Sequence, residues 1–206
     1  MRELIPLPPG MLEALRAAYA MPPRAYHHFG HVESVLGHFD AVAAGPGWGR
    51  PREAWLAVLY HDAVYEAGRR DNEARSAMLA AAEIARWLPG EGLDVAHVVD
   101  LIELTARHGS LQPGALGEGA DGDDRRHFLD CDMAILGADA AAFDAYDRAI
   151  AEEYRDAVPG WLYRLNRRRF LRGLLRSERI YLSAFFHERL DAAARDNLRR
   201  ALGGRG

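Results

Sequence analysis

The most informative part of the chain reads Trp55-Leu56-Ala57-Val58-Leu59-Tyr60-His61-Asp62-Ala63-Val64-Tyr65. Six apolar residues precede an adjacent histidine and aspartate, and apolar residues follow them, so the pattern predicts a buried helix. A buried carboxylate without a partner is strongly disfavoured. A metal ion at His61 and Asp62 would supply the missing positive charge. We therefore look for further ligands in the rest of the chain.

On both sides of this stretch the apolar residues follow the 3.6-residue period of amphipathic helices. We expect helices over roughly residues 11–20, 26–43, 51–67, 71–87, 94–108, 125–136, 139–157, 159–176 and 187–202, and no strand. Residues 109–124 contain five glycines and one proline and predict a long loop. The sequence therefore predicts an all-α fold. It is interpreted as one helical domain over residues 1–206, in which a family resemblance described below implies a core at about 26–136 and a C-terminal extension at about 139–203.

The composition excludes several classes of function. A formal net charge of -4 and a pI near 6.1 give no electrostatic reason to expect a nucleic-acid partner. No apolar run approaches the roughly 20 residues that span a bilayer, so no membrane partner is expected. The first residues lack the pattern of a signal peptide, and the single cysteine, Cys131, points to a reducing compartment. A cytoplasmic protein is the expectation.

Helical phase selects the polar residues that face the interior. His61 lies three or four positions from apolar residues on both sides, and Asp62 lies at the edge of the same surface. Asp132 is flanked in the same way, whereas Asp130 points to nearly the opposite side. If one of these two carboxylates is buried, we expect it to be Asp132. We expect Asp130 to be solvated or hydrogen-bonded to a metal-binding residue, and not to bind the metal itself. His31 shares an apolar stripe of its own helix.

Separate helices thus offer His31, His61, Asp62 and Asp132 to the interior. Imidazole and carboxylate ligands suit a divalent ion, here Mn, Co, Ni, Fe, Zn or Mg, and the sequence does not distinguish among them or between one ion and two. Four protein ligands leave room for water or substrate on an octahedral ion.

The order His…His-Asp…Asp on successive helices resembles the HD superfamily of metal-dependent phosphohydrolases over roughly residues 26–136. By position, the resemblance implies the same four metal ligands. Residues 26–31, Tyr-His-His-Phe-Gly-His, are also similar to the Tyr-His-Asn-x-x-His signature of cyclic-nucleotide phosphodiesterases. In those relatives the first histidine protonates the leaving oxygen, which assigns this role to His27, although His28 replaces the asparagine. Residues 61–65, 71–77, 105–108 and 130–137 resemble an uncharacterised bacterial branch of predicted HD phosphohydrolases.

The resemblance implies hydrolysis of a phosphate ester or anhydride through metal-activated water. The expected partner is a small phosphorylated substrate, for example a nucleotide, and a homo-oligomer is left open. Two alternatives remain at this point. One is a di-iron oxygenase of HD type, and the other is a non-catalytic, metal-stabilised module that binds a nucleotide.

Three further groups are candidates for catalysis or substrate binding. Glu66 lies one turn after Asp62 and is either a general base or a surface residue. His108 continues an apolar stripe and is either a member of the site, including a second metal, or a core histidine. Arg164 and Arg168 share one face of an arginine-rich helix, which is either a phosphate-binding face or a solvated one.

Overall fold

The computed structural model describes residues 3–204, and these residues form helices and loops without a strand. The predicted all-α class is therefore confirmed. No helix among the described residues is long and apolar enough to cross a membrane. The α-helices are α1 (Pro9–Ala20), α2 (Phe29–Ala44), α3 (Pro51–Tyr60), α4 (Asn72–Trp87), α5 (Val95–Leu104), α6 (Gly119–Met133), α7 (Ala140–Glu153), α8 (Gly160–Arg176) and α9 (Ala184–Gly203). Three short 3-10 helices complete the set: η1 (Thr105–Arg107), η2 (Pro113–Leu116) and η3 (Ala134–Gly137).

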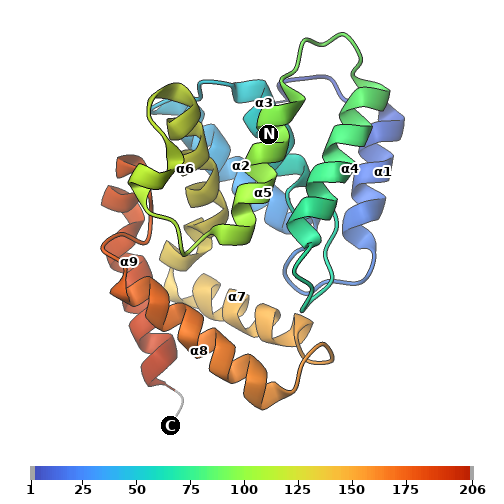
Figure 1. The fold of residues 1–206 in the computed structure, drawn as a ribbon. Helices are drawn as coiled ribbons and strands as arrows, with labels where there is room; N and C mark the ends of the chain where they lie inside the picture. The colour runs from blue at the N-terminus through green and yellow to red at the C-terminus, as the bar shows by residue number, and fades with distance from the viewer. Residues whose placement is uncertain (1–2, 205–206) are drawn as a thin grey trace.

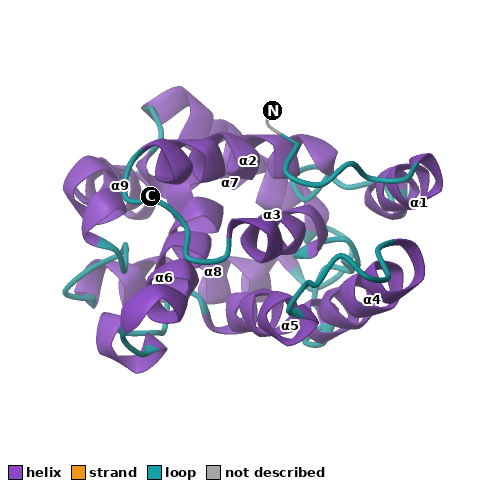
Figure 2. Cartoon of the chain, turned by 90° about the horizontal axis from the view of Figure 1, so that it is seen from above, coloured by secondary structure: helices purple, strands orange, loops and turns teal. Residues whose placement is uncertain are grey.

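Helix α3 is the centre of the bundle. It contacts α2, α4, α5 and α6, and Figures 1 and 2 show it enclosed by these helices. Every residue from Ala54 to Tyr60 is at most 2% exposed, as the apolar run predicts. Burial of each large apolar side chain contributes roughly 1.5–3 kcal/mol. Residues 55–60 therefore form the centre of the hydrophobic core.

The last three α-helices close one end of this bundle. In Figure 1, α7 and α8 cross the lower end, and α9 lies on the same side as α6. Helix α9 packs against η3 and α8, and α7 also contacts η3. One cluster of buried apolar residues includes Ile5 before α1 and Leu198 on α9. The C-terminal helices thus share a core with the helices that precede them.

The central helix ends at Tyr60, not at the predicted Ala67. His61 keeps right-handed helical geometry and donates its backbone N–H to Ala57, but the chain then leaves the helix. Ser76 on α4 bonds to both the N–H and the carbonyl of Val64, at 3.0 and 3.2 Å. Because a distant helix satisfies these backbone groups, the helix need not continue through an apolar sequence. His61 and Asp62 therefore lie at a helix end.

The predicted loop over residues 109–124 is also shorter than expected, because α6 begins at Gly119. A side-chain carbon at Gly122 would collide with the carbonyl of Gly117, so this glycine permits the loop before α6 to pack closely against the first turn of the helix. Asp124, fully buried, accepts hydrogen bonds from the backbone N–H groups of Gly49 and Arg50, at 2.7 and 2.8 Å. Smaller differences are that α5 ends at Leu104, before the predicted residue 108, and that α9 begins at Ala184, before the predicted residue 187.

The expectation of a solvent-facing Asp130 is wrong. Asp130 is 1% exposed and accepts hydrogen bonds from the N–H groups of Leu182 and Ser183, both at 2.7 Å, and from the Ser183 hydroxyl at 2.6 Å. Burial raises the pKa of Asp130 to about 7, against the opposing effect of Ser183 and the backbone N–H groups. Helix α6 is covered on two sides, so its phase alone does not identify a solvated face. Asp130 holds the segment that leads into α9.

We predict that Asp130→Ala lowers the free energy of unfolding by about 3 kcal/mol, because it leaves buried N–H groups without an acceptor. Chemical denaturation monitored by circular dichroism at pH 8 measures the loss. Asp123→Ala is the matched control, since this exposed residue of the same helix only pairs with Arg126, and it should change stability by less than about 1 kcal/mol. Equal stability of the two variants would contradict the anchoring role of Asp130.

Candidate metal centre

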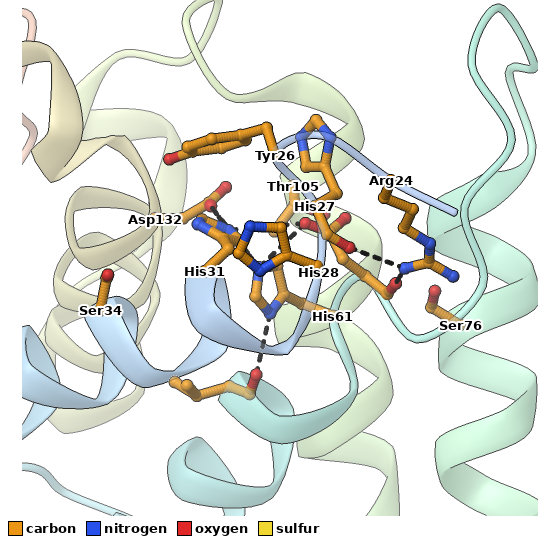
Figure 3. Close-up of polar contacts among 12 residues, drawn as sticks. Arg24, Tyr26, His27, His28, His31, Ser34, His61, Ser76, Thr105 and Asp132 are labelled. Carbon is orange, nitrogen blue, oxygen red and sulfur yellow. Dashed lines mark hydrogen bonds and ion pairs between the residues drawn. The ribbon is translucent and has the colours of Figure 1, made fainter. Parts of the chain in front are cut away.

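The structure brings together the four residues expected to bind a metal, and Figure 3 labels His31, His61 and Asp132 among them. His31 lies in the first turn of α2, His61 and Asp62 follow the end of α3, and Asp132 lies near the end of α6. One ligand atom from each residue falls within a group whose members all lie within 4.8 Å of one another. No second group of this kind occurs within residues 3–204.

The spacing of these atoms fits ligands of a single ion. The Nε2 atoms of His31 and His61 are 3.0 Å apart, and Asp132 Oδ1 lies 3.1 and 3.6 Å from them. Asp62 Oδ2 lies 3.2 Å from His61 Nε2 and 3.6 Å from His31 Nε2. Two neighbouring ligands at about 2.1 Å from one ion are separated by about 3.0–3.4 Å. Mixed imidazole and carboxylate ligands suit a divalent transition metal.

The hydrogen bond at the other nitrogen of His61 leaves Nε2 available as a ligand. His61 Nδ1 lies 2.9 Å from the backbone carbonyl of Val58, one turn earlier, and this contact is drawn in Figure 3. A carbonyl only accepts, so Nδ1 carries the hydrogen and the neutral ring presents a lone pair at Nε2. A bond of this kind orients the imidazole of a metal-binding histidine.

The charges of the group require a positive charge among them. Burial acts to raise the pKa of Asp132, but hydrogen bonds from His108, His31 and His61 hold that pKa well below its usual range. The pKa of Asp62 is likewise lowered, chiefly by His61, against the effect of burial. Two ionised carboxylates thus face the imidazoles. Either a protonated His61, whose pKa the carboxylates raise against its burial, or a metal ion can compensate them.

Arg24 fixes the turn that carries two of the ligands, and the sequence contained no signal for this role. Its guanidinium donates to the carbonyls of Asp62 and Ala63, at 2.6 and 3.1 Å. It also donates to the carbonyls of Ala18 and His27, at 3.0 and 2.9 Å. One side chain, labelled in Figure 3, therefore connects the end of α1, the segment before α2 and the turn after α3. The five donors of arginine make it suited to such a clamp.

A cavity of about 210 Å³ borders the candidate ligands Asp62 and Asp132. Its walls come from the helical core and from α7 and α8. Polar groups in its lining are His27, Glu73, Thr105, His108 and Arg167, and tyrosines 26, 65, 146 and 154 supply most of its aromatic surface. The C-terminal helices thus form one side of the candidate site.

His27 lies in this cavity with one nitrogen bound to an acidic partner. Its Nδ1 is 2.6 Å from Glu153 Oε2, while Glu153 Oε1 accepts from the backbone N–H groups of Tyr26 and His27 at 2.8 and 2.9 Å. Burial acts to raise the pKa of Glu153, but His27 and these N–H groups lower it. The ring of His27 stacks on Tyr65 at 4.1 Å. Glu153, at the end of α7, was missed because it is far away in sequence.

His108 contacts the candidate site, but it does so from beyond the end of α5. It follows η1, and its Nε2 lies 3.1 Å from Asp132 Oδ2, the carboxylate oxygen not directed at His31. Its side chain is 33% exposed, so the interpretation as a fully enclosed core histidine does not hold.

The structure places the remaining candidates outside the cavity. Glu66 is 46% exposed in its side chain and pairs with Arg75 at 2.7 Å. Arg164 is exposed, and Arg168 donates to the carbonyl of Leu202 at 3.3 Å. None of the three lines the cavity, and their expected roles stay predictions.

The arginine of α8 that does line the cavity is Arg167, which pairs with Asp147 at 3.0 Å. The inward face of α8 carries Arg167, Phe170 and the buried Leu174, and the face that carries Arg164 points outward. The sequence identified the basic helix, but it did not identify which of its faces lies at the site.

We predict that His61→Ala and Asp132→Ala each abolish stoichiometric metal binding, because each removes one of the four converging ligand atoms. Metal content after purification and metal loading is measured by inductively coupled plasma mass spectrometry. His28→Ala serves as control, because His28 accepts from the Gly30 N–H at the start of α2 and is not one of the four. Unchanged metal content in both ligand variants would refute the assignment.

Comparison with known proteins finds no match among protein-family models, curated proteins or solved structures. A proposal for the function therefore has to be based on the side chains of the candidate metal centre and its cavity.

Proposed function

We propose that the protein is a metal-dependent phosphohydrolase of HD type that cleaves a phosphate ester or anhydride in a small substrate. The observation that carries this proposal is the convergence of two imidazoles and two carboxylates at ligand spacing beside a cavity. The order of these residues along the chain, His31, His61-Asp62 and Asp132, supports it further, since it is the order that resembles the superfamily.

A divalent ion held by His31, His61, Asp62 and Asp132 would polarise a phosphoryl oxygen and lower the pKa of water. The buried ring of His61, oriented by Val58, and the two carboxylates hold the position of that ion. Arg24 keeps the turn with Asp62 in place through its bonds to the backbone.

His27 is suited to donate a proton to the leaving oxygen. Its Nδ1 is bound to Glu153, so Nε2 is the nitrogen left for the proton transfer. A carboxylate in this position orients the imidazole ring. The stack on Tyr65 limits rotation of the ring. Arg167, in the same cavity, contributes positive charge near a bound phosphoryl group.

A second candidate is the di-iron oxygenase on the same scaffold, and one observation favours it. Both oxygens of Asp132 contact histidines: Oδ1 lies near His31 and His61, and Oδ2 lies 3.1 Å from His108. His108 and Asp132 would therefore help to hold a second iron, and the pair of irons would supply the reaction with dioxygen. Two irons per chain and dioxygen-dependent turnover would favour this candidate over the hydrolase.

We predict that the protein loaded with Mn, Co, Ni, Fe, Zn or Mg hydrolyses at least one member of a panel of phosphomonoesters, phosphodiesters, pyrophosphate and nucleotides. Released phosphate and chromatographically resolved products are measured. Asp132→Ala, treated with the same ions, should show no activity. A protein that binds the metal stoichiometrically but hydrolyses no member of the panel would contradict the proposal.

We predict that His27→Gln lowers kcat by about 10²–10⁴-fold for an alkyl phosphate, whose leaving oxygen needs a proton. For 4-nitrophenyl phosphate the loss should be much smaller, because nitrophenolate leaves without a proton. Steady-state kinetics on both substrates measures the difference, with metal content as a control for folding of the site. An equal loss on both substrates would exclude His27 as the proton donor.

A further inference from the structure

A second cavity reaches the candidate metal centre from a different side. It has a volume of about 500 Å³ and lies between the first half of α2, η3 and α7. His31 and Asp132 line it, so two of the four ligand residues border this space, whereas Asp62 and Asp132 border the smaller cavity. The volume is within the range of about 300–1,000 Å³ found for small-molecule sites.

The two cavities share four residues: Tyr26, Asp132, Ile135 and Tyr146. The rings of Tyr26 and Tyr146 meet edge to face with centroids 4.7 Å apart, and Tyr26 also lies 4.8 Å from the ring of His31. This aromatic pair, beside Asp132, forms the boundary between the two spaces. A ligand bound at the metal centre can therefore extend to either side of it.

The larger cavity is lined mainly by hydrocarbon. Six alanines supply small methyl groups that leave the space open: Ala25, Ala134, Ala138, Ala142, Ala145 and Ala149. Val35, Ile135 and Leu190 add larger apolar surface. Its polar side chains, besides the two ligand residues, are His28, Ser34 and His38, and Tyr26 and Tyr146 also line it. No arginine, asparagine or glutamine lines it, so it offers no guanidinium to a phosphate chain and no side-chain amide to a nucleobase.

The smaller cavity has the opposite character. It contains His27, His108 and Arg167, which suit an anionic group and a proton transfer, and its volume of about 210 Å³ is below the range for drug-sized ligands. The metal centre therefore lies between a compact polar space and a larger apolar one.

We propose that the larger cavity, between α2 and α7, is a subsite for an apolar organic group of the substrate. The substrate class is then a phosphorylated compound with an aliphatic or aromatic hydrocarbon group, not a nucleotide. The identification of the ligand as a substrate rests on the phosphohydrolase function proposed above. The apolar binding itself follows from the lining of the cavity and is measured independently of turnover.

Binding of non-hydrolysable n-alkylphosphonates to the metal-loaded protein tests this subsite by isothermal titration calorimetry. From methyl- to octylphosphonate, we expect the affinity of the wild type to rise about two- to fourfold for each methylene that enters the cavity. Equal affinity for methyl- and octylphosphonate would overturn the proposal.

Ala145→Phe supplies the matched variant. Ala145 lines the cavity at its exposed mouth, so a larger side chain there fills the space without displacing the core. We expect it to lower the affinity for octylphosphonate by about tenfold or more and to leave methylphosphonate binding and metal content unchanged. Ala141→Phe, on an exposed position of the same helix that does not line the cavity, should behave as wild type. Undiminished octylphosphonate binding by Ala145→Phe would refute the location of the subsite.

The two proposals fail in distinguishable ways. If affinity depends on chain length and Ala145→Phe removes this dependence, the apolar subsite stands even if no phosphoester is hydrolysed, and the hydrolase proposal alone fails. If phosphoesters are hydrolysed but affinity does not depend on chain length, the hydrolase proposal stands and the subsite fails.

Discussion

Two carboxylates and two imidazoles are packed together in this protein, and a positive charge among them stabilises the carboxylates in their ionised form. The Nε2 atoms of His31 and His61 lie 3.0 Å apart, and an oxygen of Asp132 lies 3.1 Å from the former. A carboxylate in such a place is costly unless it is paired. Because α2, α3 and α6 each bring a ligand to this point, the relative placement of the three helices determines the electrostatics of the site. A divalent ion would supply the positive charge.

Polar contacts between segments far apart in the sequence fix the ends of these helices. Asp124 and Asp130, on successive turns of α6, accept backbone N–H groups before α3 and before α9. Glu153 accepts the N–H groups before α2, and Arg24 donates to the turn after α3. In each case a charged side chain satisfies backbone groups of a distant segment, which would otherwise lack partners in the interior. These contacts determine where each helix begins or ends, and the candidate ligands lie close to those ends.

The C-terminal helices give the site its two contrasting sides. Helix α7 contributes Tyr146 to both cavities, alanines to the larger one and Glu153 to the orientation of His27. Helix α8 contributes Arg167 to the smaller one. The segment from α2 to α6 thus carries the candidate ligands, while the C-terminal helices shape the space in which a substrate would lie.

The sequence alone determined the all-α class, the burial of α3 and the four candidate ligands, because helical periodicity and the cost of a buried charge are local properties of the chain. It also predicted that His27 and His108 lie near these ligands. The prediction for His27 came from the family resemblance, and the one for His108 came from the apolar stripe of its helix. Only the tertiary structure decided that α3 ends at Tyr60, that Asp130 is buried, and that Arg167 rather than Arg164 or Arg168 lines the cavity. The physical reason is the same for each. Where a helix stops, and which of its faces is covered, depends on partners such as Ser76, Ser183 and Asp147, which are brought near only by folding.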